Sequence, residues 1–250
     1  MLLIDKKMSP LKYFEFVQKQ LPAETVEQIL QVSLMNLKAL ISAYLPLEVV
    51  GEKKDALFNT LLTLLQKDGV NKDPIVDQLF GFLSSKENIQ AALGWLETGK
   101  ITVGDAALYD ITKNHKHTIL KQLFASKHFQ TTDKMELLEM TLGDEKSDLA
   151  DRTRATCMAS LPDPNVKAQI WKDLTDPANT ESKYMKSAKQ AGFYSHNQVD
   201  IVAPYFDEFY EILPKMQSQL SGPGFETFFF GLLPRIVVED KHIVKLIALK

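Results

Sequence analysis

The sequence predicts an all-α fold, and three observations support this prediction. First, apolar residues recur at steps of three and four along most of the chain, which is typical of helices that bury one face. Second, strand signals are nearly absent, because we find no sustained apolar/polar alternation and no Asn-Gly pair, and the Asp-Gly pair at Asp68-Gly69 follows an apolar stretch and is interpreted as a helix end, not as a hairpin turn. Third, proline and glycine divide the chain into short segments. We therefore expect about a dozen short helices joined by tight turns.

The expected helices follow in order from caps, apolar stripes and stops. Three pairs combine an N-capping side chain with proline at the first helical position: Ser9-Pro10, Asp73-Pro74 and Asp163-Pro164. Three apolar stripes predict buried helix faces: Val26, Ile29, Leu30, Leu34, Leu37, Ile41, Tyr44 and Leu45; Leu57, Phe58, Leu61, Leu62 and Leu65; and Val166, Ile170, Trp171 and Leu174. Glycines after apolar stretches predict helix ends: Gly51, Gly69, Gly99, Gly143 and Gly192.

Short helices with one apolar face each cannot bury that face alone, so they must stack on neighbours. We find no fixed repeat length. The sequence therefore predicts an irregular superhelical array of antiparallel helices, similar to HEAT or armadillo α-solenoids. Residues 1–250 are expected to form a single helical domain, because nothing in the composition marks a boundary and the SGPG sequence at 221–224 is interpreted as a turn.

The composition excludes several classes of function. The chain has 250 residues and a net charge of −3, with lysines and acids interspersed, which argues against nucleic-acid binding. The apolar opening MLLID is too short for a secretory signal, and no apolar span reaches membrane length. A single cysteine, Cys157, and the lack of an Asn-x-Ser/Thr site favour a cytoplasmic location. Cys157 has small and apolar neighbours and is expected to be a buried structural thiol.

The segment KNHKHTILKQLFASKH holds three of the five histidines and is therefore a candidate metal site. His115 and His117 are two residues apart and would point about 200° from each other on a helix. His128 would lie about 16 Å beyond His117 along the axis. No metal site is predicted here. The interleaved lysines predict a solvated, weakly basic helix surface: Lys113, Lys116 and Lys121.

No catalytic signature is found either. The sequence has no H-E-x-x-H, no G-x-S-x-G, no phosphate-binding glycine loop and no dinucleotide fingerprint. Two pairs of acids are interpreted as exposed helix charges: Asp207/Glu208 and Glu239/Asp240. An aromatic cluster is interpreted as core rather than as a ligand pocket: Phe225, Phe228, Phe229 and Phe230. We assign no catalytic, metal-binding or substrate-binding residue in this chain.

An ordered set of motifs is more specific. The segments are LPDPNVKAQIWKDLTD, KSAKQAGFYSHNQVDIVAPYFDEFYEILPKM and FETFFFGLLP, preceded at the start of the chain by MLLIDKKMSPLKYFEFVQKQLPAET. Together they resemble the C-terminal helical domain of the M1 zinc aminopeptidases, the aminopeptidase N family. The matching residues of the later segments are Gln169, Ile170, Trp171, Gly192, Phe193, Tyr194, Gln198, Pro204, Tyr205, Phe206, Phe209, Leu213, Phe229, Gly231, Leu232 and Pro234. Those of the first segment are Ser9, Pro10, Tyr13, Val17, Leu21, Pro22 and Glu24.

The resemblance implies a large enzyme in which this domain is not the catalytic one. Zinc would be held by H-E-x-x-H and a distant glutamate in another domain, and a G-x-M-E-N loop would hold the substrate amine. Neither motif occurs here. Met135-Glu136 is preceded by Lys134 and followed by Leu137, so it does not form G-x-M-E-N. The implied role is to enclose the active-site chamber and control peptide access. The implied partners are the catalytic domain of the same polypeptide and peptide substrates, and zinc is a cofactor of the full-length enzyme only.

The sequence at both ends is typical of a fragment of a longer protein, because the chain begins in an apolar stretch and ends in the amphipathic KHIVKLIALK. A second reading is a non-catalytic helical scaffold that binds a protein partner. A hydrolase that uses Cys157 with a histidine has no support from spacing.

Overall fold

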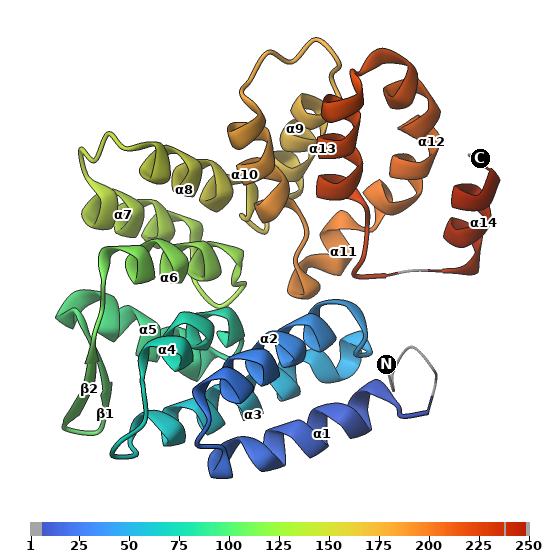
Figure 1. The fold of residues 1–250 in the computed structure, drawn as a ribbon. Helices are drawn as coiled ribbons and strands as arrows, with labels where there is room; N and C mark the ends of the chain where they lie inside the picture. Colours follow the sequence, from blue (N-terminus) through green and yellow to red (C-terminus); the bar gives the residue numbers. More distant parts are fainter. Residues whose placement is uncertain (1–6, 238, 249–250) are drawn as a thin grey trace. The chain divides into compact units, whose positions relative to one another are not determined.

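The computed structural model describes residues 7–237 and 239–248, and within them it contains fourteen α-helices and one two-stranded hairpin (Figure 1). The all-α prediction is confirmed, whereas the solenoid arrangement stays a prediction. Contacts divide the chain into two compact units, 1–122 and 123–250, and each is described by itself. The expectation of a single domain stays a prediction. The opening MLLID and the last two residues lie outside the described residues.

The first unit contains five helices, the hairpin and most of a sixth helix. Its elements are α1 (Pro10–Gln20), η1 (Leu21–Ala23), α2 (Glu27–Ala43), α3 (Leu47–Leu65), α4 (Asp73–Leu79), η2 (Phe80–Phe82), α5 (Lys86–Thr98), β1 (Lys100–Val103), β2 (Ala106–Asp110) and α6 (Lys113–Ala125).

The predicted start of α1 is confirmed, because the Ser9 hydroxyl accepts from the Lys12 amide (3.3 Å). The predicted cap at Asp73 is wrong. Asp73 is the first residue of α4, whose N-cap is Lys72, and its carboxylate instead accepts from the Tyr109 hydroxyl (2.6 Å). Gly51 does not end a helix, since it lies inside α3.

The core of the first unit is formed by the predicted stripes in α2 and α3, where Leu34, Leu37, Leu57 and Leu61 are fully buried. The stripe in α2 is wrong at its ends, because Val26, Ile29 and Tyr44 are about half exposed. Trp95 of α5 completes this core by stacking on Phe58 at 5.9 Å between ring centroids.

The hairpin β1–β2 was not predicted. Its strands are antiparallel, and Val103 pairs with Ala106 across a two-residue Gly104-Asp105 turn. Gly104 has φ +57°, a conformation that favours glycine. A Gly-Asp pair between apolar residues is also typical of a hairpin turn. A prediction that considers only Asn-Gly and Asp-Gly pairs does not include it. Ile101 is the buried anchor of β1, and the Trp95 indole donates to the Thr102 carbonyl (3.2 Å).

The second unit contains the end of α6 and eight further helices. Its elements are α7 (Thr131–Leu142), α8 (Asp148–Ala159), α9 (Pro164–Leu174), α10 (Lys183–Phe193), η3 (His196–Gln198), α11 (Val199–Val202), α12 (Pro204–Gln219), α13 (Gly222–Leu232) and α14 (Asp240–Ala248). The Asp163 cap of α9 is confirmed by its bond from the Asn165 amide (2.8 Å).

Helix α10 is the centre of this unit, with extensive contact to α8 and further contact to α9 and α13 (Figure 1). Gly192 was expected to end a helix, but it lies inside α10 and faces α8. An added Cβ there would come within 2.3 Å of the Thr156 carbonyl oxygen. The glycine is therefore required by close helix packing rather than by a turn.

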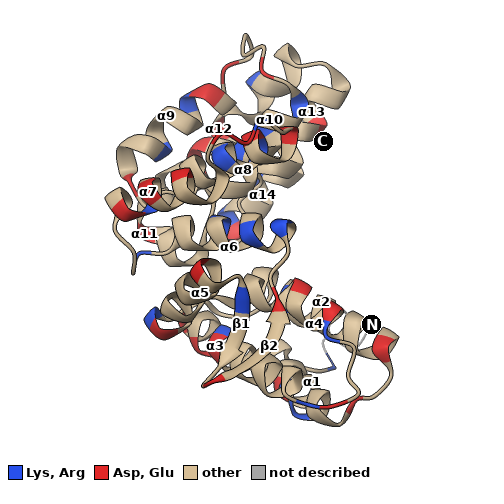
Figure 2. Ribbon diagram, turned by 90° about the vertical axis from the view of Figure 1, so that its left-hand side faces the viewer, with Lys and Arg blue, Asp and Glu red and all other residues tan. Residues whose placement is uncertain are grey.

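Aromatic side chains fill the core between α9, α10, α12 and α13. Trp171 stacks on Phe193 (5.5 Å) and Phe209 stacks on Phe228 (5.6 Å between centroids). The core assignment of the 225–230 cluster is correct for Phe228, whereas Phe230 is 63% exposed. Elsewhere, Lys/Arg and Asp/Glu are interspersed along the helices (Figure 2).

Candidate functional site

The histidine segment forms the predicted solvated surface only in part, because Lys113 and His128 are exposed whereas two of its histidines are buried. His115 and His117 of α6 are 7% and 2% exposed, so this interpretation is wrong for both. The Thr112 amide donates to Nδ1 of His115 (3.2 Å), and Nε2 lies 3.1 Å from the Asp77 carboxylate. Because Nδ1 accepts, the proton of the neutral ring is on Nε2 and points at Asp77. His115 therefore caps α6 and joins it to α4.

His242 of α14 repeats this arrangement. Its Nδ1 accepts from the Glu239 amide (3.2 Å), and its Nε2 lies 3.2 Å from the Asp207 carboxylate of α12. Its ring stacks on Tyr210 at 4.8 Å. Asp207, expected to be a simple exposed charge, also accepts from Lys241 (2.9 Å), and these contacts hold its pKa below the ordinary value.

A buried polar cluster joins the C-terminal ends of α6, α8 and α10. The ammonium of Lys167 donates to three carbonyls, of Ala159 (2.6 Å), Gly192 (3.1 Å) and Phe193 (2.6 Å). Lys167 is fully buried, and burial lowers its pKa to about 7. A lysine here satisfies helix-end carbonyls that have no partner within their own helices.

Lys134 and Gln198 extend the same cluster. Lys134 of α7 is fully buried and donates to the carbonyls of Phe124 (2.9 Å) and Ser126 (2.6 Å), and burial lowers its pKa to about 8. The Gln198 amide, also fully buried, donates to the carbonyls of Ala125 (2.7 Å) and Ser160 (2.9 Å). Sequence analysis missed both lysines. The available signal was a lysine at the fourth residue of a helix, eight or nine residues after the end of the preceding helix.

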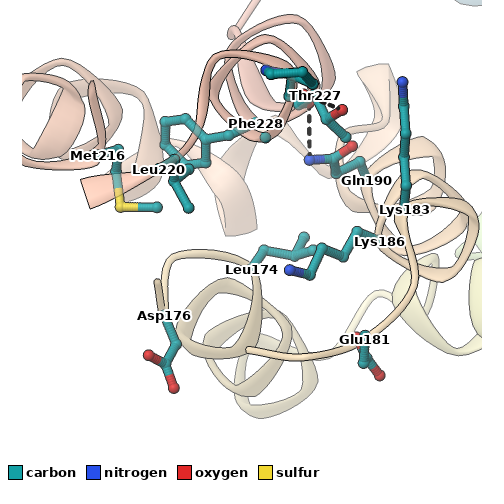
Figure 3. A pocket seen from close by; sticks show the side chains of 12 residues that line it. Leu174, Asp176, Glu181, Lys183, Lys186, Gln190, Met216, Leu220, Thr227 and Phe228 are labelled. Atoms are coloured by element: carbon teal, nitrogen blue, oxygen red, sulfur yellow. Dashed lines mark hydrogen bonds between the residues drawn. The ribbon is translucent and has the colours of Figure 1, made fainter. Parts of the chain in front are cut away.

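The second unit also has a pocket of about 230 Å³ between the α9–α10 connection, α10, α12 and α13 (Figure 3). Four side chains form its apolar wall: Leu174, Met216, Leu220 and Phe228. Lys186 reaches into it and donates to the Asn179 carbonyl (2.6 Å), which fixes the loop after α9. Gln190 closes one side by donating to the Thr227 carbonyl (3.2 Å).

This pocket is a candidate for ligand contact, because an apolar wall stands beside polar and charged groups. Gln190 is held there by its fit over Gly231, where an added Cβ would come within 2.1 Å of the Gln190 amide oxygen. The carboxylates of Asp176 and Glu181 point away from the pocket centre (Figure 3). The arrangement can hold an apolar side chain beside an amine, and it offers no nucleophile paired with a base.

The remaining predicted features are placed as follows. Cys157 is fully buried in α8, as expected for a structural thiol. Glu208 accepts from the Trp171 indole (2.7 Å), so it is not a simple surface charge. Within 7–237 and 239–248, no three His, Cys, Asp or Glu side chains are grouped to hold a metal ion. None of the helices in those ranges is long and apolar enough to cross a membrane.

No protein-family model matches this chain, and no curated protein matches it significantly.

Proposed function

We propose that this chain is the C-terminal helical domain of an M1-type zinc aminopeptidase, in which it encloses the active-site chamber and controls the access of peptides. The full-length enzyme removes N-terminal residues from peptides and acts in the cytoplasm. In this proposal the zinc belongs to another domain, as the resemblance to the M1 family implies, because H-E-x-x-H does not occur in this chain. Catalysis therefore also belongs to that other domain.

One observation carries this proposal: the residues of the ordered motifs make the tertiary contacts of the second unit. Trp171, Phe193 and Tyr205 pack on one another, with centroids 5.0 to 5.5 Å apart. Gln198 bridges the ends of α6 and α8. Gly231 makes room for Gln190. Because these positions lie far apart in the sequence, their contacts give the motif residues a common role in the packing of this unit.

The pocket between α10 and α13 gives this function a surface that can touch a peptide. Its apolar wall suits a hydrophobic side chain, and its lysines suit a carboxylate or a backbone carbonyl. A domain that encloses a chamber needs such contacts to retain some peptides longer than others. In this role the pocket selects substrates and performs no chemistry.

The proposal is tested on the native polypeptide. An antibody against this chain should detect a product several-fold larger than 28.3 kDa. That product, immunopurified, should hydrolyse amino-acid anilides and lose this activity with a zinc chelator. A native product of 28.3 kDa without such activity would contradict the proposal and favour a non-catalytic scaffold.

A further inference from the structure

Helix α2 of the first unit has two apolar faces, and only one of them is packed. The inner face carries Leu30, Leu34, Leu37 and Ile41, all buried. At 100° per residue, a second set lies within a sector of about 120° on the other side of the helix. This outer face carries Ile29, Val32, Met35, Ala39 and Ala43, with the polar Gln28 and Asn36 in the same sector, and all seven are exposed.

The exposure of the outer face is substantial, since Ile29, Val32 and Met35 are 50%, 57% and 62% exposed. Single exposed apolar residues are ordinary on protein surfaces. Several exposed apolar residues gathered on one helix face instead mark a contact surface, because burying them together releases water from their apolar area. The outer face of α2 therefore has the form of a site for another helix.

An acidic rim borders this face. A hollow of about 320 Å³ between α2 and α4 is lined by Glu27, Gln31, Met35, Asn71, Asp73, Pro74, Asp77 and Gln78. The lining includes three carboxylates and no lysine or arginine, and Met35 belongs both to the hollow and to the outer face. Hydrogen bonding to Asp73, with burial and the nearby carboxylates adding to it, raises the pKa of Tyr109 to about 12.

We propose that the outer face of α2 and its acidic rim bind an amphipathic helical segment of a partner protein, with an apolar stripe flanked by lysine or arginine. The apolar stripe covers Ile29, Val32 and Met35, and the basic residues reach the carboxylates of Glu27, Asp73 and Asp77. The charge of the rim selects this partner, because an acidic segment would bring like charges together as water is excluded. An anionic lipid surface is disfavoured for the same reason.

The test uses two synthetic peptides of about 18 residues, long enough to form a helix on the surface. Both carry leucine at helical spacing, one with lysine and the other with glutamate at the remaining positions. Fluorescence anisotropy with the full chain should show the lysine peptide binding at least about tenfold more tightly than the glutamate peptide. Raising the salt concentration from about 50 mM to about 500 mM should reduce this difference in affinity, because salt screens the attraction between the lysines and the carboxylates.

Two variants locate the contact. The double variant Val32→Asn, Met35→Asn should weaken lysine-peptide binding about tenfold or more, since it removes the apolar anchors without adding charge. Glu27→Gln should weaken it about two- to threefold at low salt only. The matched controls on α7, Met140→Asn and Glu136→Gln, change an exposed methionine and an exposed glutamate in the other unit and should leave binding unchanged.

Equal binding of the two peptides, or binding that the double variant leaves unchanged, would overturn the proposal. Sedimentation of the chain alone gives a further outcome. If the wild type is a dimer that the double variant converts to monomers, the occupant of this face is a second copy and the assignment to a basic partner is wrong. None of these outcomes bears on the size or activity of the native polypeptide, so failure here is distinct from failure of the proposed function.

Discussion

Lys167 and Lys134 show how a single charged side chain can hold several helix ends together. Each is the fourth residue of its helix, and each donates to a carbonyl eight residues earlier, of Ala159 and Ser126 respectively, at 2.6 Å. Lys167 also reaches the end of α10. Burying an amine is unfavourable, but without it these carbonyls would lose their partner inside the protein.

Replacing Lys167 by methionine is expected to destabilise the chain by at least about 1–3 kcal/mol, because buried carbonyls lose their donor while the volume is kept. Urea denaturation followed by circular dichroism measures the change. Lys172→Met is the control, since Lys172 lies on the same helix but is exposed. Equal stability of the two variants would show that the carbonyl contacts of Lys167 contribute little.

The lowered pKa values of the two lysines predict a dependence of stability on pH. Near pH 7 to 10, the folded chain loses protons from these amines, whereas the unfolded chain keeps them because the ordinary pKa of a lysine is 10.5. Because the unfolded state then binds more protons, stability should rise with pH, by up to about 1.4 kcal/mol per pH unit for each lysine.

Denaturation of the wild type and of Lys167→Met at several pH values between about 7 and 9 measures this effect. The wild type should gain more stability than the variant over this range, since the variant lacks one of the titrating amines. A parallel pH dependence in both proteins would show that Lys167 keeps its proton in the folded chain.

At the scale of secondary-structure elements, two glycines set how closely helices approach. Gly192 brings α10 against the backbone of α8, and Gly231 lets the Gln190 side chain lie between α10 and α13. Trp171, Phe193 and Phe209 then fill the space between these helices. The aromatic core depends on the close approach of α10 to α8 and α13, because larger distances between these helices would leave gaps that no side chain fills.

Gly192→Ala is expected to cost about 1–3 kcal/mol or more, because its Cβ would overlap the Thr156 carbonyl and α10 would have to move. Gly94→Ala is the matched control. Gly94 lies inside α5 with no atom within 4 Å of an added Cβ, so alanine should stabilise that helix by about 0.5–1 kcal/mol. Thermal unfolding of the two variants should therefore shift in opposite directions, and a shift in the same direction would contradict this account of Gly192.

At the scale of the whole molecule, metal removal provides a test. If zinc belongs to another domain, as proposed, the stability of this chain should not depend on zinc. Its melting temperature should stay the same with a chelator or with added zinc, measured by differential scanning fluorimetry. A chelator-induced decrease would reveal a metal site in the chain and would contradict the assignment of zinc to another domain.

The sequence could predict features that depend on neighbours along the chain. Helical periodicity gave the all-α class, and the caps at Ser9 and Asp163 placed two helix starts, because these signals act within one turn. The hairpin turn at Gly104-Asp105 is also a local feature, so the sequence predicts it when Gly-Asp pairs are counted among hairpin turns. The burial of Cys157 also followed from its neighbours.

Other features depend on residues far apart in the sequence. The charge pattern around His115 predicts solvent exposure, yet its ring is buried and contacts Asp77 of α4 and Phe80 of η2. The role of Lys167 depends on where α8 and α10 end, and the pocket beside Gln190 depends on the approach of α13. The sequence by itself determined which segments are helical. Only the tertiary structure decided which polar side chains are buried between them and where the apolar stripes end, because burial at these positions depends on the partner that each helix face meets.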